Sequence, residues 1–128
     1  WGAMIEASKK VKPWRTDVKE AALECYSSGA LNLPVKAEIE FVFPRPKSHY
    51  GTGKNADVLK PSAPKFCTSR GNGDIDKLSR STLDGLSVSA GGSVLEDDSL
   101  VVELNTKKRY INKDELPGAY IAISSICD

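Results

Sequence analysis

The sequence is poor in the residues that build soft-metal sites and covalent frameworks. It has one histidine, His49, and three widely spaced cysteines, Cys25, Cys67 and Cys127. None of the cysteines forms a C-x-x-C pair, which argues against a zinc site, and a single histidine excludes a histidine-rich zinc or HNH-type centre. A Ser-His-Asp triad would depend on His49 alone. An odd number of distant cysteines also argues against a disulfide framework, so we expect a reducing, intracellular setting.

The sequence also lacks a long apolar run and an excess of one charge. No segment approaches the roughly 20 apolar residues that a helix needs to cross a bilayer, and no signal-peptide pattern is present, so we expect no membrane partner. With 18 basic and 17 acidic residues the chain is no polycation. Its 128 residues, 40% of them apolar, can form one hydrophobic core, and we expect a single domain over residues 1–128.

The balanced total hides an uneven distribution of charge. Residues 44–70 carry six basic side chains and one acidic side chain, whereas residues 71–128 carry six basic and ten acidic ones. A basic segment therefore leads directly into an acidic one. An enzyme that cleaves phosphodiesters needs both, because cations hold the phosphates and carboxylates hold a metal ion. Ordinary variation among polar surface loops would give the same pattern, so charge alone leaves both interpretations open.

Periodicity predicts two helices and three strands. A helix begins after Pro13, which suits a first turn, and Gly29 closes it. Apolar residues alternate with charged ones over residues 35–43, the period of a half-buried strand. A second helix runs from Ile75 to Leu86, and two further strands lie near residues 98–108 and 120–126. In the first of these, Leu100, Val102 and Leu104 are expected to face the core.

Between the first strand and the second helix, residues 44–73 show no sustained periodicity. Proline, glycine, serine, lysine and asparagine dominate this segment. A loop of this length inside a compact domain is unusual and tends to be functional or disordered. We favour a functional loop, because it delivers the chain to the acidic segment.

Carboxylates at two places in the acidic segment suit a hard divalent cation. Asp74 and Asp76 lie at the start of the second helix, and Glu96, Asp97 and Asp98 precede the next strand. Oxygen ligands of this kind bind Mg²⁺, which keeps several waters and uses few carboxylates. The alternative is that Asp74 and Asp76 are only cap and first-turn residues, which the helix dipole favours. If the strand begins near Asp98, side chains alternate between its two faces from that point, and the Asp98 side chain would point toward the helix.

Several segments together resemble a known family. They are residues 44–53 (PRPKSHYGTG), 59–64 (LKPSAP), 74–86 (DIDKLSRSTLDGL) and 96–98 (EDD), with 10–15 (KVKPWR) near the first helix. This combination resembles the RusA family of Holliday junction resolvases, most closely the branch found in bacteriophages and prophages. The resemblance covers roughly residues 8–126. Each motif alone is weak, whereas the combination is specific.

The resemblance implies an α+β fold in which two helices pack on a small mixed β-sheet. It implies a homodimeric endodeoxyribonuclease that binds four-way DNA junctions and nicks two strands symmetrically with Mg²⁺, for which Mn²⁺ could substitute. The family's essential aspartates correspond to Asp74, Asp76 and Asp98. Its basic residue four positions after the second aspartate corresponds to Arg80, and a lysine in the following strand corresponds to Lys108. The expected location is the cytoplasm of a bacterial or phage-infected cell.

Phosphate contacts are expected from the basic residues of the long loop and from the strand lysine, as a set: Lys47, Lys54, Lys60, Lys65, Arg70 and Lys108. The sequence departs from the family pattern where Gly71-Asn72-Gly73 replaces the usual proline before Asp74. The strand that usually precedes the first helix is expected to be absent from the sequence. Two other functions remain open, a metal-dependent nuclease acting on other branched DNA and a non-catalytic DNA-binding module.

Overall fold

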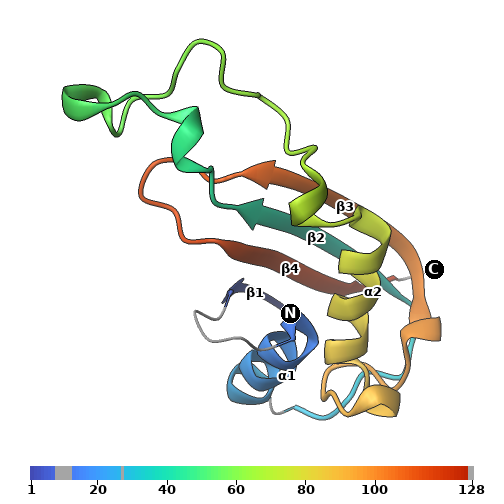
Figure 1. Cartoon of the computed structure of the whole chain (residues 1–128). Helices are drawn as coiled ribbons and strands as arrows, with labels where there is room; N and C mark the ends of the chain where they lie inside the picture. The colour runs from blue at the N-terminus through green and yellow to red at the C-terminus, as the bar shows by residue number, and fades with distance from the viewer. Residues whose placement is uncertain (8–12, 27, 127–128) are drawn as a thin grey trace.

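Two helices pack on one face of a four-stranded sheet in the computed structural model (Figure 1). The structure describes residues 1–7, 13–26 and 28–126. Cys127 and the Lys10 to Lys12 part of the family-like motif lie outside the described residues. Within the described part of the chain, no helix is long and apolar enough to cross a membrane.

The sheet has the order β1-β4-β2-β3 and is mixed. The strands are β1 (Gly2–Glu6), β2 (Val35–Phe43), β3 (Val101–Tyr110) and β4 (Gly118–Ser125). Strand β2 pairs with β3 in parallel and with β4 in antiparallel orientation, and β1 pairs antiparallel with β4. The α+β class with a mixed sheet is confirmed.

Strand β1 is not predicted by the sequence pattern. The strand preceding the first helix was expected to be absent, but residues 2–6 form it at one edge of the sheet. The Trp1 ammonium group donates to the Ile123 carbonyl oxygen at 2.8 Å, and the Ile123 amide donates to the Trp1 carbonyl oxygen at 2.6 Å. The expectation of a missing edge strand is therefore wrong for these residues.

The core lies between the sheet and the helices α1 (Trp14–Cys25) and α2 (Ile75–Leu86). Alternate β2 residues such as Ile39 and Phe41 point into it, as the period of two predicted. The helices meet closely, since a Cβ atom on Gly85 would lie 2.8 Å from the carbonyl oxygen of Arg15. Across the same contact, the indole nitrogen of Trp14 donates to the Thr82 hydroxyl at 2.8 Å.

One register prediction for β3 is wrong. Val102 is 63% exposed rather than part of the core, because the pairing of β2 with β3 shifts by one residue between Val35 and Lys36. Such a bulge places an extra residue in one strand and changes which side chains face inward. After the bulge, Thr106 and Lys108 lie opposite the core residues Ile39 and Phe41, so they share the helix-covered face.

Residues 44–73 form an arm that extends beyond the end of the sheet (Figure 1). Three short 3-10 turns interrupt it, and a backbone bridge joins Tyr50 to Leu59. At its base the Arg45 guanidinium lies 4.3 Å from the centre of the Tyr110 ring and donates to the Pro64 carbonyl oxygen at 2.6 Å. These contacts fix the arm on the end of β3.

Candidate active site

The N-terminus of α2 presents two exposed aspartates. Asp74 occupies the N-cap position, yet its side chain makes no capping hydrogen bond. Its side chain is 72% exposed, and one carboxylate oxygen lies 3.8 Å from the Lys77 ammonium. Asp76 follows in the first turn and is also exposed. The interpretation of Asp74 as a simple helix cap is therefore not supported, and its carboxylate is available to a ligand.

Lys108 connects β3 to the beginning of this helix. Its ammonium group donates to the carbonyl oxygen of Gly73 at 2.9 Å, immediately before Asp74. The lysine is half-buried, and it holds the glycine-rich approach to Asp74 against the sheet. Gly73 has a φ of +84°, a conformation that glycine adopts without steric cost. Lys108 was predicted to contact DNA phosphate, and here it contacts the backbone beside the aspartates.

Asp98 lies at the other end of α2. Strand β3 runs antiparallel to the helix, because its late residue Lys108 meets Gly73 while the earlier Thr106 meets Ser79 at 3.1 Å. Asp98 opens a 3-10 turn just before β3 begins at Val101. A 12-residue helix is about 18 Å long, so a separation of this order lies between Asp98 and Asp74 within one chain.

Asp97 is tied to the segment that follows α2. Its carboxylate accepts from the Ser89 hydroxyl at 2.7 Å and from the Ser99 amide at 3.0 Å. Hydrogen bonds from Ser99 and then Ser89 lower the pKa of Asp97 to about 2. The strand begins at Val101 rather than near Asp98, so the parity argument that turned Asp98 toward the helix does not apply.

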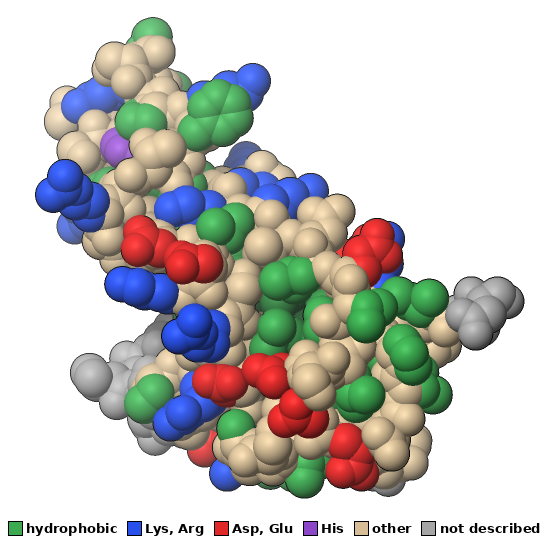
Figure 2. Space-filling model, turned by 90° about the vertical axis from the view of Figure 1, so that its right-hand side faces the viewer, with side chains coloured by type: hydrophobic (Ala, Val, Ile, Leu, Met, Phe, Trp, Pro, Cys, Tyr) green, Lys and Arg blue, Asp and Glu red, His purple; other side chains and the backbone are tan. Residues whose placement is uncertain are grey.

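The described residues contain no group of three or more His, Cys, Asp or Glu side chains that could hold one metal ion. Figure 2 shows the side of the molecule that carries α2 and β3. The acidic side chains on this side form separate groups, and basic side chains lie between two of these groups. The structure therefore brings together Asp74, Asp76 and Lys108 but not Asp98. Arg80 is exposed, one helical turn beyond Asp76.

The remaining predicted DNA contacts lie on the arm. All are exposed, and none pairs with a carboxylate in the described part of the chain: Lys47, Lys54, Lys60, Lys65 and Arg70. The Lys65 ammonium lies 5.6 Å from the centre of the Phe66 ring, which is on a residue that is itself 70% exposed. Free cations on a protruding segment suit phosphate binding, and their contact with DNA stays a prediction.

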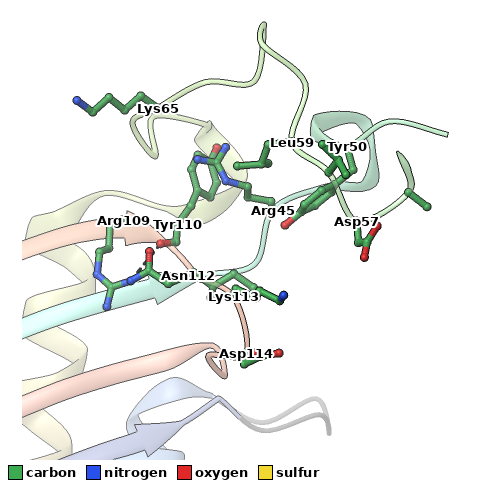
Figure 3. Close-up of a pocket in the computed structure, with 13 residues that line it drawn as sticks. Arg45, Tyr50, Asp57, Leu59, Lys65, Arg109, Tyr110, Asn112, Lys113 and Asp114 are labelled. Carbon is green, nitrogen blue, oxygen red and sulfur yellow. Dashed lines mark hydrogen bonds between the residues drawn. The ribbon is translucent and has the colours of Figure 1, made fainter. Parts of the chain in front are cut away.

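Sequence analysis missed a hollow of about 920 Å³ between the arm and the β3–β4 turn. Arg45, Tyr50 and Leu59 line it from the arm, and Tyr110, Asn112 and Lys113 line it from the sheet side (Figure 3). No local pattern indicates this hollow, because Arg45 and Tyr110 meet only in the folded chain. The sequence shows the motif around Arg45 and Tyr50, whereas the contribution of the β3–β4 turn depends on the fold.

Comparison with known proteins identifies one family. A family model described as Endodeoxyribonuclease RusA matches residues 2–124. The match includes both aspartates of the α2 N-terminus, Asp98, Lys108 and the whole arm. No curated protein matches the chain.

Proposed function

Because the chain belongs to the RusA family of endodeoxyribonucleases, which resolve Holliday junctions by hydrolysing phosphodiester bonds, we propose that it nicks two strands of a four-way DNA junction with Mg²⁺ at Asp74, Asp76 and Asp98. The observation that carries the proposal is the pair of exposed aspartates at the α2 N-terminus. The Asp74 side chain makes no capping hydrogen bond, and Lys108 donates a hydrogen bond to the carbonyl oxygen of the preceding residue, Gly73. A purely structural pair would use the Asp74 carboxylate to cap the helix. We place the enzyme in the cytoplasm of a bacterial or phage-infected cell.

The donor set fits a hard divalent cation, although one copy of the chain offers only part of it. Mg²⁺ is commonly bound through one or two carboxylates and keeps waters in its other positions, which suits exposed Asp74 and Asp76. Mn²⁺ accepts the same oxygen ligands. When bound, the metal ion supplies Lewis-acid stabilisation of the scissile phosphate and lowers the pKa of a coordinated water.

We infer that a second copy of the chain supplies Asp98 to the site. Within one copy, Asp98 and Asp74 are separated by about the length of α2, on the order of 18 Å. If two copies pair with their α2 helices antiparallel, the end that carries Asp98 meets the partner's helix N-terminus. A two-fold axis then makes two equivalent sites, which matches the two equivalent strands of a four-way junction.

Exposed apolar side chains support a partner at the Asp98 end of the helix. Val88 is 43% and Leu104 44% exposed, and both come from the segments that flank Asp98 in the sequence. Leu104 lies opposite the core residue Ala37, on the face of the sheet that carries the helices, and exposed apolar groups of this kind are typical of surfaces that another protein covers. In this arrangement the dimer would both complete the metal site and bury this apolar surface.

The remaining residues of the site have distinct roles in the proposal. Lys108 holds the Gly73 carbonyl and so positions Asp74. Arg80 lies one turn beyond Asp76, from where its guanidinium can reach the phosphate that is being cleaved and stabilise the charge that develops on it. The arm cations hold the flanking phosphates, which orients the strand without reading its sequence.

The decisive experiment uses a mobile four-way junction labelled on each strand in turn. With Mg²⁺ the purified protein should produce paired nicks at symmetry-related positions, and with EDTA it should only bind. Flap and fork substrates of matched sequence run in parallel separate a junction resolvase from a nuclease for other branched DNA. Binding of the junction without nicks in either Mg²⁺ or Mn²⁺ would overturn the catalytic proposal in favour of a binding module.

A further inference from the structure

The hollow between the arm and the β3–β4 turn takes no part in the catalysis proposed above. Its volume of about 920 Å³ lies within the range of roughly 300 to 1,000 Å³ that small-molecule sites occupy. In Figure 3, Tyr50 comes from the arm on one side and Lys113 from the turn on the other. The hollow is therefore formed by two separate parts of the chain that face each other.

The lining combines an aromatic ring with cations, of which Lys113 is free and Arg45 is held in place. Tyr50 is half-buried, and its main chain is fixed by the bridge to Leu59. Lys113 is exposed and forms no ion pair with a carboxylate of the described residues. Arg45 is held in place over the Tyr110 ring and by the Pro64 carbonyl oxygen. Rings beside cations are the means by which proteins hold single-stranded nucleic acid, since bases stack and phosphates pair.

Two carboxylates limit how much of a strand the hollow can accept. Asp57 and Asp114 also line it, and they would repel several phosphates in succession. A base is compatible with them, because its amino groups can donate hydrogen bonds to a carboxylate. The lining therefore suits one nucleotide, with its base inside and its phosphate at Lys113, better than a continuous run of phosphates.

The position of the hollow relates it to the aspartates. Tyr110 lines the hollow and lies two residues after Lys108 on β3, so both side chains share the helix-covered face. Two residues of a strand span about 7 Å. Lys108 in turn donates a hydrogen bond to the carbonyl oxygen of Gly73, the residue before Asp74. A strand whose phosphate lies at Asp74 and Asp76 would therefore pass close to the Tyr110 side of the hollow.

We propose that this hollow holds one unpaired nucleotide next to the scissile phosphate, with its base stacked on Tyr50 and its phosphate paired with Lys113. The inference rests on the proposed function, because it takes the strand to be one that is cut at the α2 N-terminus. It adds a place for a nucleotide that has left the base stack at the branch point. Such a site would favour branched DNA over a continuous duplex, in which no base is free to enter.

The test measures whether the Tyr50 ring and one base act as a pair. Four-way junctions carry a single abasic nucleotide at each position around the branch point in turn, and binding is measured in EDTA so that no strand is cut. With the wild-type protein, one abasic position should weaken binding roughly 5- to 10-fold, at the lower end of base–aromatic stacking effects. Tyr50→Leu should bind the intact junction with a similar loss and show no further loss at that abasic position.

Three other variants keep the result interpretable. Tyr50→Phe retains the ring and should behave as the wild type with intact and abasic junctions. Lys113→Ala should reduce the slope of log affinity against log salt by about one, the signature of one phosphate contact. Lys36→Ala is the matched control on the opposite face of the sheet, where Lys36 pairs with Glu38, and it should leave the slope unchanged.

The inference is overturned if Tyr50→Leu binds the intact junction as tightly as the wild type. It is equally overturned if the abasic penalty is the same with and without the ring, or if no abasic position weakens binding by the wild-type protein. These readings are independent of cleavage. A wild-type protein that never nicks a junction in Mg²⁺ contradicts the proposed function, whereas one that nicks normally without a Tyr50-dependent abasic penalty contradicts the nucleotide site alone.

Discussion

The Nζ atom of Lys108 donates a hydrogen bond of 2.9 Å to the carbonyl oxygen of Gly73. This bond joins an edge strand of the sheet to the residue that precedes Asp74. Residues Arg70–Asn72 before Gly73 form a 3-10 turn that contacts the rest of the arm, since the Asn72 side-chain amide donates to the Cys67 sulfur at 3.0 Å, and the Lys108 bond ties this turn to the sheet. The placement of the proposed metal ligand therefore depends on a side chain 34 residues later in the sequence.

Replacing Lys108 by methionine should impair cleavage more than binding. Lys108→Met keeps the length of the side chain and removes the donor, and loss of a group that orients a metal ligand typically costs about 10- to 100-fold in activity. Junction affinity in EDTA should fall by less than about 3-fold, since the phosphate contacts of the arm remain. Single-turnover nicking and junction binding measure the two effects.

Lys107→Met is the matched control for that experiment. Lys107 is the next residue of β3, but its ammonium lies 3.4 Å from Glu40 on the face of the sheet that the helices leave open. It should therefore retain nearly full nicking. If Lys108→Met loses affinity and activity to the same extent, Lys108 acts as a phosphate contact rather than as a positioning residue.

Neutralising Asp76 should abolish nicking while junction binding survives or tightens. Asp76→Asn removes a ligand of the proposed metal ion and also removes a negative charge near the DNA phosphates. Glu38→Gln, a charge-neutralising change on the open face of the sheet, should leave nicking unchanged. Nicking by Asp76→Asn at the wild-type rate in Mg²⁺ would remove Asp76 from the catalytic site.

Mixing two inactive variants should restore cleavage if each site combines two copies of the chain. A dimer of Asp76→Asn with Asp98→Asn contains one site with both defects and one intact site. An equal mixture should regain up to about a quarter of the wild-type nicking, with a single nick per junction. If both aspartates of a site came from the same copy, every site in the mixture would stay defective and no activity would return.

The ion network on the open face should make stability fall in acid. Arg109 bonds Glu115 at 2.7 Å and also pairs with Glu40. The Arg109 hydrogen bond lowers the pKa of Glu115 from its ordinary 4.5 to about 2 and lowers the pKa of Glu40 in the same direction. A lowered folded-state pKa gives stability that is complete above about pH 4.5 and is lost as the pH falls toward 2.

Arg109→Leu tests this assignment. Removing the guanidinium should lower the free energy of unfolding at pH 7 by about 1 to 2 kcal/mol, because charged hydrogen bonds near the surface contribute modestly. It should also flatten the decline in stability between pH 4.5 and pH 2. Urea unfolding at a series of pH values measures both effects. An equally steep decline in Arg109→Leu would show that other carboxylates cause it.

A methyl group at Gly85 should destabilise the contact between the helices. The Cβ atom of Gly85→Ala would lie 2.8 Å from both the Arg15 carbonyl oxygen and the Val18 Cβ atom. Overpacking of this kind costs about 1 to 3 kcal/mol, which exceeds the gain of up to about 1 kcal/mol in helix propensity. Gly71→Ala is the control, because its nearest neighbour would be the Ser69 hydroxyl at 3.9 Å. Thermal unfolding compares the two variants.

Local pattern predicted most of the fold. The alternation over β2 and the apolar spacing of α2 depend on which face of an element is buried, and this information is carried by neighbouring residues. Strand β1 has no such pattern, since it is short and only Ile5 is fully buried. Its pairing with β4 makes it a strand, and a partner more than 100 residues away leaves no local signal.

The candidate site was predictable only in its local parts. Asp74 and Asp76 lie at the start of a helix, as expected, because both belong to one short segment. Their relation to Asp98 depends on β3 running antiparallel to α2, which is a property of tertiary packing. A single bulged residue in β3 was enough to expose Val102 against expectation. Parity arguments hold only while a strand stays regular.

The opposite placement of Asp74 and Asp98 along α2 has a geometric consequence for the proposed pair of copies. One catalytic centre would contain Asp74 of the first copy, and the other centre would contain Asp98 of that same copy. The interval between the two cuts would then equal the interval between these residues inside one rigid body, on the order of 18 Å. The length of the helix would then set the distance between the two cut positions, whatever the sequence of the DNA.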